Sequence, residues 1–264
     1  MFKSLHEHLA NWSANPRRAR PDYIAARLWH LAGVRLRSAL RLQNPPEPLD
    51  PPVETGYVEI FQNSTFRRSV AQVRDRSCLD MVRLANLWHG VRAAEPGCFL
   101  EIGTYRGGTA LHICNAIDAF RPGSPFYCFD PFERGGYESV GPDEGEFTPN
   151  DFMNTSYSEV AKLLAAKPDA TVVQGYFPAA AEAYNLHDIS FCHLDINVYS
   201  ATLASLQFLA PRLTPGGIVM LDDIGRCETP GVRRAVMEFL AQYPSFFLIE
   251  LFPCQGLLVS RGRL

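Results

Sequence analysis

An acidic residue and a glycine-rich turn follow a short apolar run near residue 100. The segment from Glu101 to Thr109 has the sequence EIGTYRGGT, and residues 110–119 continue as an expected helix. A strand, a tight turn and a helix open a parallel α/β unit, and glycines let the turn approach a ligand closely. The spacing is G-x-x-x-G-G rather than the G-x-G-x-x-G of dinucleotide binders, so the turn alone fits a ligand site or a purely structural turn.

A second acidic strand end favours the ligand site. Residues 126–129 read as a buried strand ending at Asp130, which lies 27 residues after Gly103. A carboxylate roughly 20 residues after such a turn accepts hydrogen bonds from the ribose hydroxyls in nucleotide-binding folds. The pair predicts a nucleoside-containing cofactor.

Three further carboxylates end later strands. Asp195 follows the apolar residues 189–194, and Asp222 and Asp223 follow residues 217–221. The carboxyl ends of neighbouring strands meet at the ligand crevice of a doubly wound sheet, so we expect these groups to converge beside the cofactor turn. Unneutralised carboxylates repel one another, and a bound Mg²⁺ ion, which prefers oxygen ligands, would neutralise their charge. For Asp222 and Asp223 the alternative is a solvated turn or a helix cap.

The elements that must position these groups alternate along the chain. Helical patterns occur at residues 78–89, 110–119, 156–167, 201–213 and 230–242, and strand patterns at 170–174, 189–194, 217–221, 246–251 and 256–260. Alternation of this kind predicts helices on both faces of a parallel sheet. The terminal pair of strands predicts an antiparallel edge strand.

The N-terminal part of the chain differs in charge. Residues 1–43 hold eight Arg and Lys against two acids, a net +6, which leaves −9 of the total of −3 for the rest. Apolar residues at helical spacing from Ile24 to Leu40 predict a basic amphipathic helix. Packing on its own domain or on a second subunit is favoured over docking on an anionic membrane, and a homo-oligomer is expected. Five prolines then mark residues 44–53 as a stiff linker to a domain over residues 54–264.

Composition excludes several function classes. The 264 residues are 47% hydrophobic, which fits one large α/β domain beyond the N-terminal segment. A net charge of −3 and a pI of about 6.2 argue against nucleic acid as a partner. Seven cysteines without a C-x-x-C pair, and the lack of a signal peptide or an 18-residue apolar run, predict a cytoplasmic protein.

Taken together in order, the acidic and glycine-bearing segments resemble a known family. They begin at Glu101 (EIGTYRGG), Asp130 (DPFE), Gln174 (QGYFP), His193 (HLDINVYSAT) and Pro215 (PGGIVMLDD). From about residue 78 onward the chain is similar to the macrocin/mycinamicin-type (TylF/MycF) O-methyltransferases. The resemblance implies a Rossmann-like, doubly wound sheet of seven strands, and the basic amphipathic helix expected within residues 1–43 would be a helical N-terminal extension of it. It also implies S-adenosylmethionine as cofactor, magnesium, and a small-molecule hydroxylated acceptor.

The resemblance and the strand ends together define an expected site. We expect the metal on Asp195, Asp222 and Asp223. We expect the cofactor on Glu101, Gly103, Thr104, Tyr105, Gly107, Gly108, Thr109, Asp130, Phe132, Gly175, Tyr176 and Asp195.

The general base stays open at this stage. Related sequences often carry a second carboxylate two residues after the position of Asp195, but here that residue is Asn197, which does not take up a proton in the same way. The catalytic candidates are therefore Asp195, His193 and solvent. Because His193 lies within an apolar strand, a neutral, packed histidine is the favoured interpretation.

These observations predict a magnesium- and S-adenosylmethionine-dependent O-methyltransferase acting on a hydroxyl of a sugar or another polyhydroxylated natural product. A catechol-type phenolic O-methyltransferase would use the same metal chemistry. A non-catalytic cofactor-binding or membrane-docking subunit is the alternative from another class. The acidic, glycine-rich segment 131–150 is expected to be an acceptor-binding lid, and its polarity favours polar acceptors.

Overall fold

The computed structural model describes residues 58–137 and 152–261. They belong to the second of two compact units of the chain, Glu54–Leu264. The expected basic helix of residues 1–43, the linker of residues 44–53 and most of the segment 131–150 lie outside the described residues and stay predictions. Within the described ranges, no helix is both long and apolar enough to cross a membrane.

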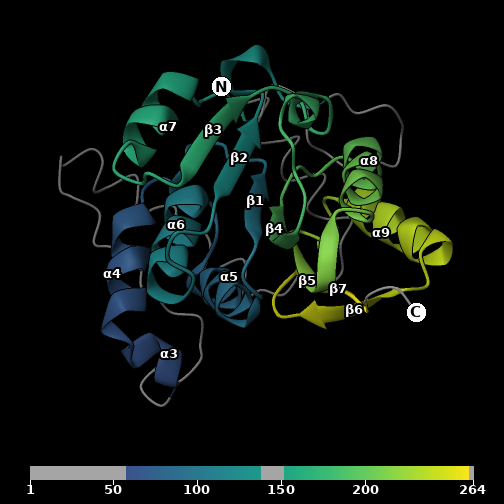
Figure 1. Ribbon diagram of the computed structural model, residues 1–264, viewed down its shortest axis with the longest axis horizontal. Coiled ribbons are helices and arrows are strands. Elements are labelled where there is room, and N and C mark those ends of the chain that lie inside the picture. The colour runs from purple at the N-terminus through teal and green to yellow at the C-terminus, as the bar shows by residue number, and fades with distance from the viewer. Residues whose placement is uncertain (1–57, 138–151, 262–264) are drawn as a thin grey trace, which may run out of the picture. The chain divides into compact units, whose positions relative to one another are not determined.

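Seven strands form one sheet in the order β3-β2-β1-β4-β5-β7-β6 (Figure 1). Strands β1 to β5 are parallel, and β7 is antiparallel to both β5 and β6. The predicted doubly wound α/β fold is confirmed, but the reversed strand β7 lies one place inside the edge, which is formed by β6. The strands are β1 Cys98–Ile102, β2 Phe126–Asp130, β3 Ala170–Gln174, β4 Ile189–Leu194, β5 Leu213–Leu221, β6 Phe246–Leu251 and β7 Gln255–Ser260.

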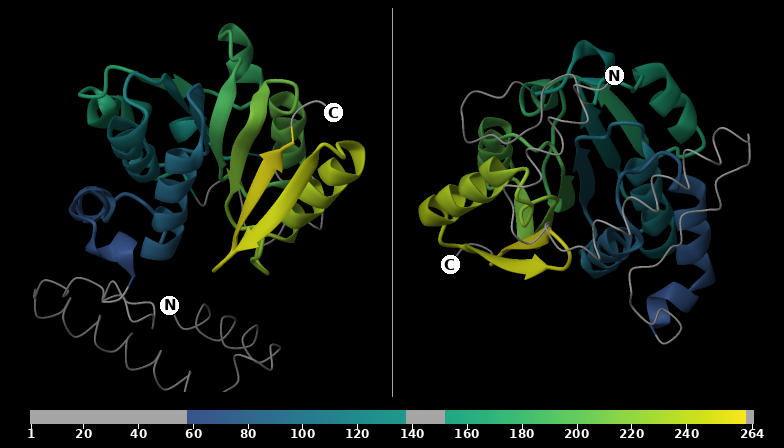
Figure 2. Two further views of the ribbon diagram at one scale, coloured as in Figure 1. Left: turned by 60° about the horizontal axis from the view of Figure 1, so that its bottom comes forward. Right: turned by 180° about the vertical axis from the view of Figure 1, so that it is seen from behind.

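Helices cover both faces of this sheet, as Figures 1 and 2 show for α5 and α6 on one face and α8 and α9 on the other. The helices are α3 Glu59–Gln62, α4 Ser64–Val73, α5 Met81–Ala93, α6 Gly108–Phe120, α7 Tyr157–Leu164, α8 Tyr199–Leu209 and α9 Pro230–Gln242, with short 3₁₀ turns η2 Phe132–Arg134 and η3 Ala179–Ala183.

Two apolar clusters, one on each face, hold the helices to the sheet. Successive side chains of a strand point to opposite faces. Phe99 and Phe191 therefore join the cluster under α4, α5 and α6, whereas their neighbours Leu100 and Cys192 join the cluster under α8 and α9. Because helices cover both faces of β1 and β4, all residues of these strands are buried and exposed polar residues do not alternate with apolar ones, as expected for central parallel strands.

Several element boundaries differ from the sequence prediction, and two of the differences have a clear local reason. Helix α5 begins at Met81 because Asp80 caps it, accepting from the backbone N–H groups of Val82 and Arg83 at 2.9 and 3.0 Å. Strand β5 begins at Leu213, four residues before the prediction, so α8 is shorter than expected. The early part of β5 contains Pro215 and two glycines, which are disfavoured in strands and hid this start.

Candidate functional site

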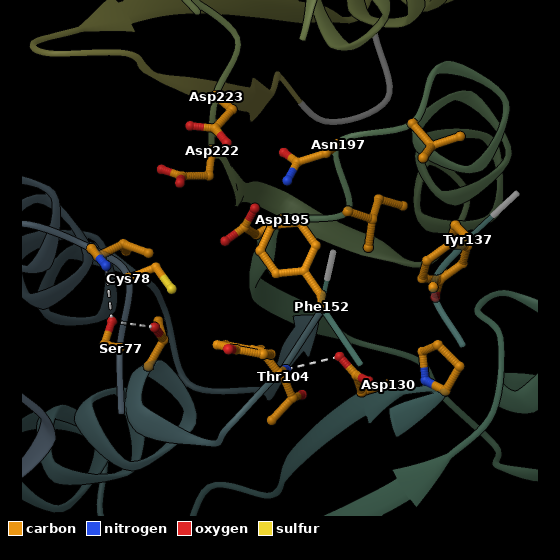
Figure 3. Close-up of a pocket in the computed structure, with 18 of the residues that line it drawn as sticks. Ser77, Cys78, Thr104, Asp130, Tyr137, Phe152, Asp195, Asn197, Asp222 and Asp223 are labelled. Carbon is orange, nitrogen blue, oxygen red and sulfur yellow. Dashed lines mark hydrogen bonds between the residues drawn. The ribbon is translucent and has the colours of Figure 1, made fainter. Parts of the chain in front are cut away.

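A cavity of about 300 Å³ opens at the carboxyl ends of β1, β2, β4 and β5 (Figure 3). Asp130 lies at one end of it, Asp222 and Asp223 lie at the other, and Asp195 lies between them. The predicted convergence of strand-end carboxylates on one cavity is therefore present. A volume of this size is at the lower end of the range for small-molecule sites, roughly 300–1,000 Å³.

Backbone N–H groups of the two surrounding turns hold Asp130. Tyr105 N–H donates to Oδ2 at 2.8 Å, and Phe132 N–H donates to Oδ1 at 2.5 Å. Burial raises the pKa of Asp130 to about 6, although these backbone hydrogen bonds act in the opposite direction. Each carboxylate oxygen retains a lone pair with which to accept a ligand hydroxyl.

The glycines of the first turn are required by packing within the chain. At Gly103 φ is +93°, and an added Cβ would lie 1.8 Å from the carbonyl oxygen of Asp195. At Gly108 an added Cβ would lie 2.4 Å from the backbone nitrogen of Ser77. The turn is therefore compressed against β4 and against the segment before α5, and of its three glycines only Gly103 lines the cavity.

The other expected cofactor residues divide into two groups. Thr104, Tyr105, Thr109, Phe132 and Asp195 line the cavity together with Gly103 and Asp130, whereas Glu101, Gly107, Gly108, Gly175 and Tyr176 do not. The hydroxyl of Tyr176 instead donates to the carbonyl oxygens of Arg134 and Gly135, both at 3.3 Å.

Glu101 and His193 form a buried pair in the sheet, beneath the turn. They are register partners on β1 and β4, both side chains are fully buried, and His193 Nδ1 lies 3.1 Å from Glu101 Oε1. Burial raises the pKa of Glu101, and the hydrogen bond and charge of His193 lower it. Neither residue lines the cavity.

The carboxylates at the acidic end of the cavity are more buried than Asp130 at the other end, which is 9% exposed. Asp222 and Asp223 are 2% and 5% exposed. Burial raises the pKa of Asp195 and of Asp223, and the adjacent charge of Asp222 raises both further. Ligand atoms of Asp222, Asp223 and Cys254 lie within 4.8 Å of one another, a spacing that a metal ion would fit, and Asp195 lies outside this group.

Two cations unforeseen from the sequence approach these carboxylates. Arg83 of α5 is 8% exposed and donates from Nη1 to Asp222 Oδ2 at 2.6 Å. Its Nη1 also lies 3.5 Å from Asp223 Oδ1, and Arg226 Nη1 lies 3.5 Å from the same atom. The premise that the carboxylates are unneutralised is therefore wrong for Asp222 and Asp223. A basic residue within the apolar pattern of α5 was the available sequence signal for Arg83.

Two buried acceptor atoms at this end have no hydrogen-bond partner among the described residues. They are Asp222 Oδ1 and Asn197 Oδ1, and both residues line the cavity. Buried polar atoms in native proteins are nearly always satisfied, so atoms of this kind in a cavity indicate where a ligand, an ion or water binds.

Comparison with known proteins supplies the family. Residues 100–224, which contain the glycine turn and all four cavity carboxylates, match the model of the methyltransferase domain family. These residues form a methyltransferase domain. The mycinamicin III 3''-O-methyltransferase of Micromonospora griseorubida is 27% identical over 183 residues, which cover 61% of this chain and 68% of the relative.

Solved structures agree with this domain assignment at the level of the fold. The O-methyltransferase NovP aligns with a TM-score of 0.59 and 21% identity, over 71% of this chain and 82% of NovP. The calicheamicin methyltransferase CalS11 aligns with a TM-score of 0.57 and 19% identity, over 80% of this chain and 93% of CalS11. The predicted resemblance to the macrocin/mycinamicin-type, S-adenosylmethionine-dependent O-methyltransferases is confirmed.

Proposed function

We propose that this methyltransferase transfers the methyl group of S-adenosylmethionine to a hydroxyl of a sugar or another polyhydroxylated natural product. The observation that carries the proposal is that one cavity joins a nucleoside-type carboxylate, Asp130, to the carboxylates Asp195, Asp222 and Asp223. The relative's name assigns it methylation of the 3''-oxygen of mycinamicin III, an acceptor of this class.

The cofactor is proposed to lie along the β1 and β2 ends of the cavity. Asp130 would accept hydrogen bonds from the ribose, and the lining backbone from Gly103 to Tyr105 would border the nucleoside. Asp195 would face the methionine part. The remaining predicted cofactor residues lie outside the cavity lining and would contribute by shaping the two turns rather than by touching the cofactor. They are Glu101, Gly107, Gly108, Gly175 and Tyr176.

We propose that a divalent cation, magnesium, binds at the acidic end of the cavity. Asp222 Oδ1 is buried and lacks a hydrogen-bond partner in the described part of the chain, and Asp222 and Asp223 approach each other closely enough to share an ion. Asp195, in the same cavity, would complete an oxygen-rich ligand set of the kind that magnesium prefers. When bound, the ion would acidify and orient the acceptor hydroxyl.

The chain's own residues would position the two reactants and accept the proton. Holding two reactants in line supplies much of the rate enhancement of a transfer reaction. We propose Asp195 rather than His193 as the proton acceptor, because Asp195 lines the cavity whereas His193 is buried beside Glu101. Asn197 Oδ1, which has no hydrogen-bond partner within residues 58–137 and 152–261, would accept a hydrogen bond from the substrate to be methylated.

The proposal is tested in two stages with the full chain. Calorimetric titration with S-adenosylhomocysteine, with and without Mg²⁺, should show micromolar binding, and no binding under either condition would overturn the cofactor assignment. Mass spectrometry of reactions with S-adenosylmethionine should then show a gain of one methyl group on glycosylated macrolide acceptors. Methylation of catechols alone would replace the sugar proposal with the phenolic one. The cytoplasmic location and the homo-oligomeric state remain predictions.

A further inference from the structure

Arg83 makes three charge-assisted or backbone contacts from a nearly buried position. Its Nε donates to Asp80 Oδ2 at 3.0 Å, its Nη2 donates to the carbonyl oxygen of Cys78 at 2.9 Å, and its Nη1 donates to Asp222 Oδ2 at 2.6 Å. The guanidinium group therefore connects the start of α5, the segment that forms one cavity wall, and the end of β5. All three of its nitrogen atoms are engaged, so its orientation is fixed.

The position of Arg83 is unfavourable for a positive charge unless nearby carboxylates stabilise it. Arg83 lies in the first turn of α5, where the helix dipole disfavours positive charge. Burial also disfavours the charged form, but Asp222 and Asp80 outweigh it and raise the pKa of Arg83 above its ordinary value. The carboxylates thus stabilise the guanidinium, and by the same interactions the guanidinium stabilises them.

Arg83 leaves the two oxygens of Asp222 in different states. Oδ2 accepts from the guanidinium group, whereas Oδ1 is buried and has no partner among the described residues. A divalent ion bound by Oδ1 would therefore be separated from the guanidinium group of Arg83 only by the carboxylate group of Asp222. We propose that Arg83 is a resident counter-cation that weakens divalent-ion binding at the cluster of Asp222, Asp223 and Cys254, so that an ion is held reversibly.

Two effects of Arg83 on ion affinity oppose each other, and their size decides the direction. The hydrogen bond from Arg83 Nη1 holds Asp222 in place, which favours ion binding, but a single hydrogen bond has a modest effect. Repulsion between the guanidinium group and the ion acts at a few ångströms in a poorly solvated site and doubles for a divalent charge. The repulsion is the larger effect, so loss of Arg83 should strengthen ion binding.

The test is a titration with Mn²⁺ alone, followed by the paramagnetic resonance of free Mn²⁺. It compares the wild-type chain with Arg83→Gln, which keeps an amide donor and loses the charge, and with Arg83→Lys, which keeps the charge and loses the fork. Arg233→Gln is the matched control, because Arg233 pairs with Glu250 on the surface at 2.6 Å and does not line the cavity. Asp222→Asn in the Arg83→Gln background tests the location of the ion.

We expect Arg83→Gln to bind Mn²⁺ at least about tenfold more tightly than the wild type. Arg83→Lys keeps the positive charge, and Arg233→Gln changes a residue outside the cavity. Both should therefore bind Mn²⁺ within about threefold of the wild type. Asp222→Asn should remove the gain. Equal or weaker binding by Arg83→Gln, including no binding by either protein, would overturn the proposal. If Arg83→Gln is too unstable to titrate, Mn²⁺ must raise its melting temperature more than that of the wild type, and an equal or smaller rise overturns it.

The inference rests on the proposed placement of a divalent ion at this end of the cavity. Its test uses neither cofactor nor acceptor, so it fails independently of the transfer reaction. Tight S-adenosylhomocysteine binding with an unchanged Mn²⁺ response would leave the methyltransferase proposal standing and remove the role of Arg83.

Discussion

Asp130 and Asp222 are buried carboxylates that the chain stabilises in different ways. Backbone N–H groups hold Asp130, which forms no ion pair with another described residue, whereas Arg83 holds Asp222. Backbone N–H groups favour the ionised form without a counter-charge, and burial opposes it. Asp130 consequently has a pKa near the physiological range, about 6, so its proposed contact with the cofactor should be sensitive to pH.

We therefore predict that affinity for S-adenosylhomocysteine falls as the pH drops below about 6, the pKa of Asp130. Protonation removes an acceptor for a ribose hydroxyl, so the affinity is present above this pKa and is lost below it. Asp130→Asn should bind at least about tenfold more weakly, the effect of losing one hydrogen bond to a charged group, with a flatter profile between pH 5 and 8. Calorimetry across this range checks the prediction, with Asp118→Asn as a surface control. An unchanged profile in Asp130→Asn would contradict the assignment.

Gly103 provides a second prediction, which separates backbone strain from close packing. Gly103 and Gly123 both have positive φ, +93° and +80°, but an added Cβ meets the carbonyl oxygen of Asp195 at 1.8 Å in the first and nothing within 4 Å in the second. Gly123→Ala should cost about 1 kcal/mol from the backbone alone. Gly103→Ala should cost about 3 kcal/mol more, from overpacking. Urea unfolding measures both, and equal costs would show that β4 yields at this point.

At the scale of single residues, the sequence predicts the strand-end carboxylates but not the cations Arg83 and Arg226 that pair with them. Asp130, Asp195, Asp222 and Asp223 each follow an apolar run, and parallel topology brings the ends of such runs to one edge. Arg83 is 139 residues away from Asp222 in the chain, so only the packing of α5 against β5 reveals the contact. The position of Glu101 also escaped prediction, because its burial beside His193 depends on the register of β1 and β4.

At the scale of elements, a buried histidine joins three helices on one face of the sheet. His112 of α6 is fully buried, and its Nε2 lies 3.0 Å from the carbonyl oxygen of Leu84 on α5, so Nε2 carries the proton. Its Nδ1 then accepts from the hydroxyl of Ser69 on α4 at 2.8 Å. Burial lowers the pKa of His112 to about 4, because this arrangement is built for the neutral ring.

The stability of the fold should consequently fall between pH 6.5 and pH 4, through His112. In this window the unfolded chain binds a proton at the histidine and the folded chain does not, so the stability is complete above 6.5 and is lost as the pH falls. The loss should reach about 3 kcal/mol at pH 4. Urea unfolding of His112→Gln should show a flatter dependence on pH than the wild type, and replacement of the exposed His187 by Asn is the control. Parallel curves for wild type and His112→Gln would refute this role.

Element types were more predictable than their ends. Strands β3 and β4 and helix α9 have the predicted bounds, because apolar runs and helical periodicity are unambiguous there. The start of β5 was not predictable, because Pro and Gly occupy it and both are disfavoured in strands. The inner place of β7 was not predictable either, because strand order depends on tertiary packing. No local pattern specifies which neighbour a terminal hairpin adds to.

At the scale of the whole methyltransferase unit, the cavity joins the two halves of the sheet. Its lining comes from the β1 and β2 side, with Thr104 and Asp130, and from the β4 and β5 side, with Asp195 and Asp222. A ligand that spans the cavity therefore contacts both halves. Such a ligand binds only the folded state, so it stabilises the fold as a whole.

The last prediction follows from this linkage. S-adenosylhomocysteine at a hundredfold excess over its dissociation constant should add about 2.7 kcal/mol of stability and raise the melting temperature by roughly 5–10 °C for a unit of this size. Adenosine at the same concentration, which reaches only the Asp130 end, should raise it much less, because it binds more weakly. Differential scanning calorimetry of the wild type and Asp130→Asn measures both. Equal shifts for adenosine and S-adenosylhomocysteine would mean that the ligand does not extend towards Asp195, and the cofactor would then have to be placed at the nucleoside end alone.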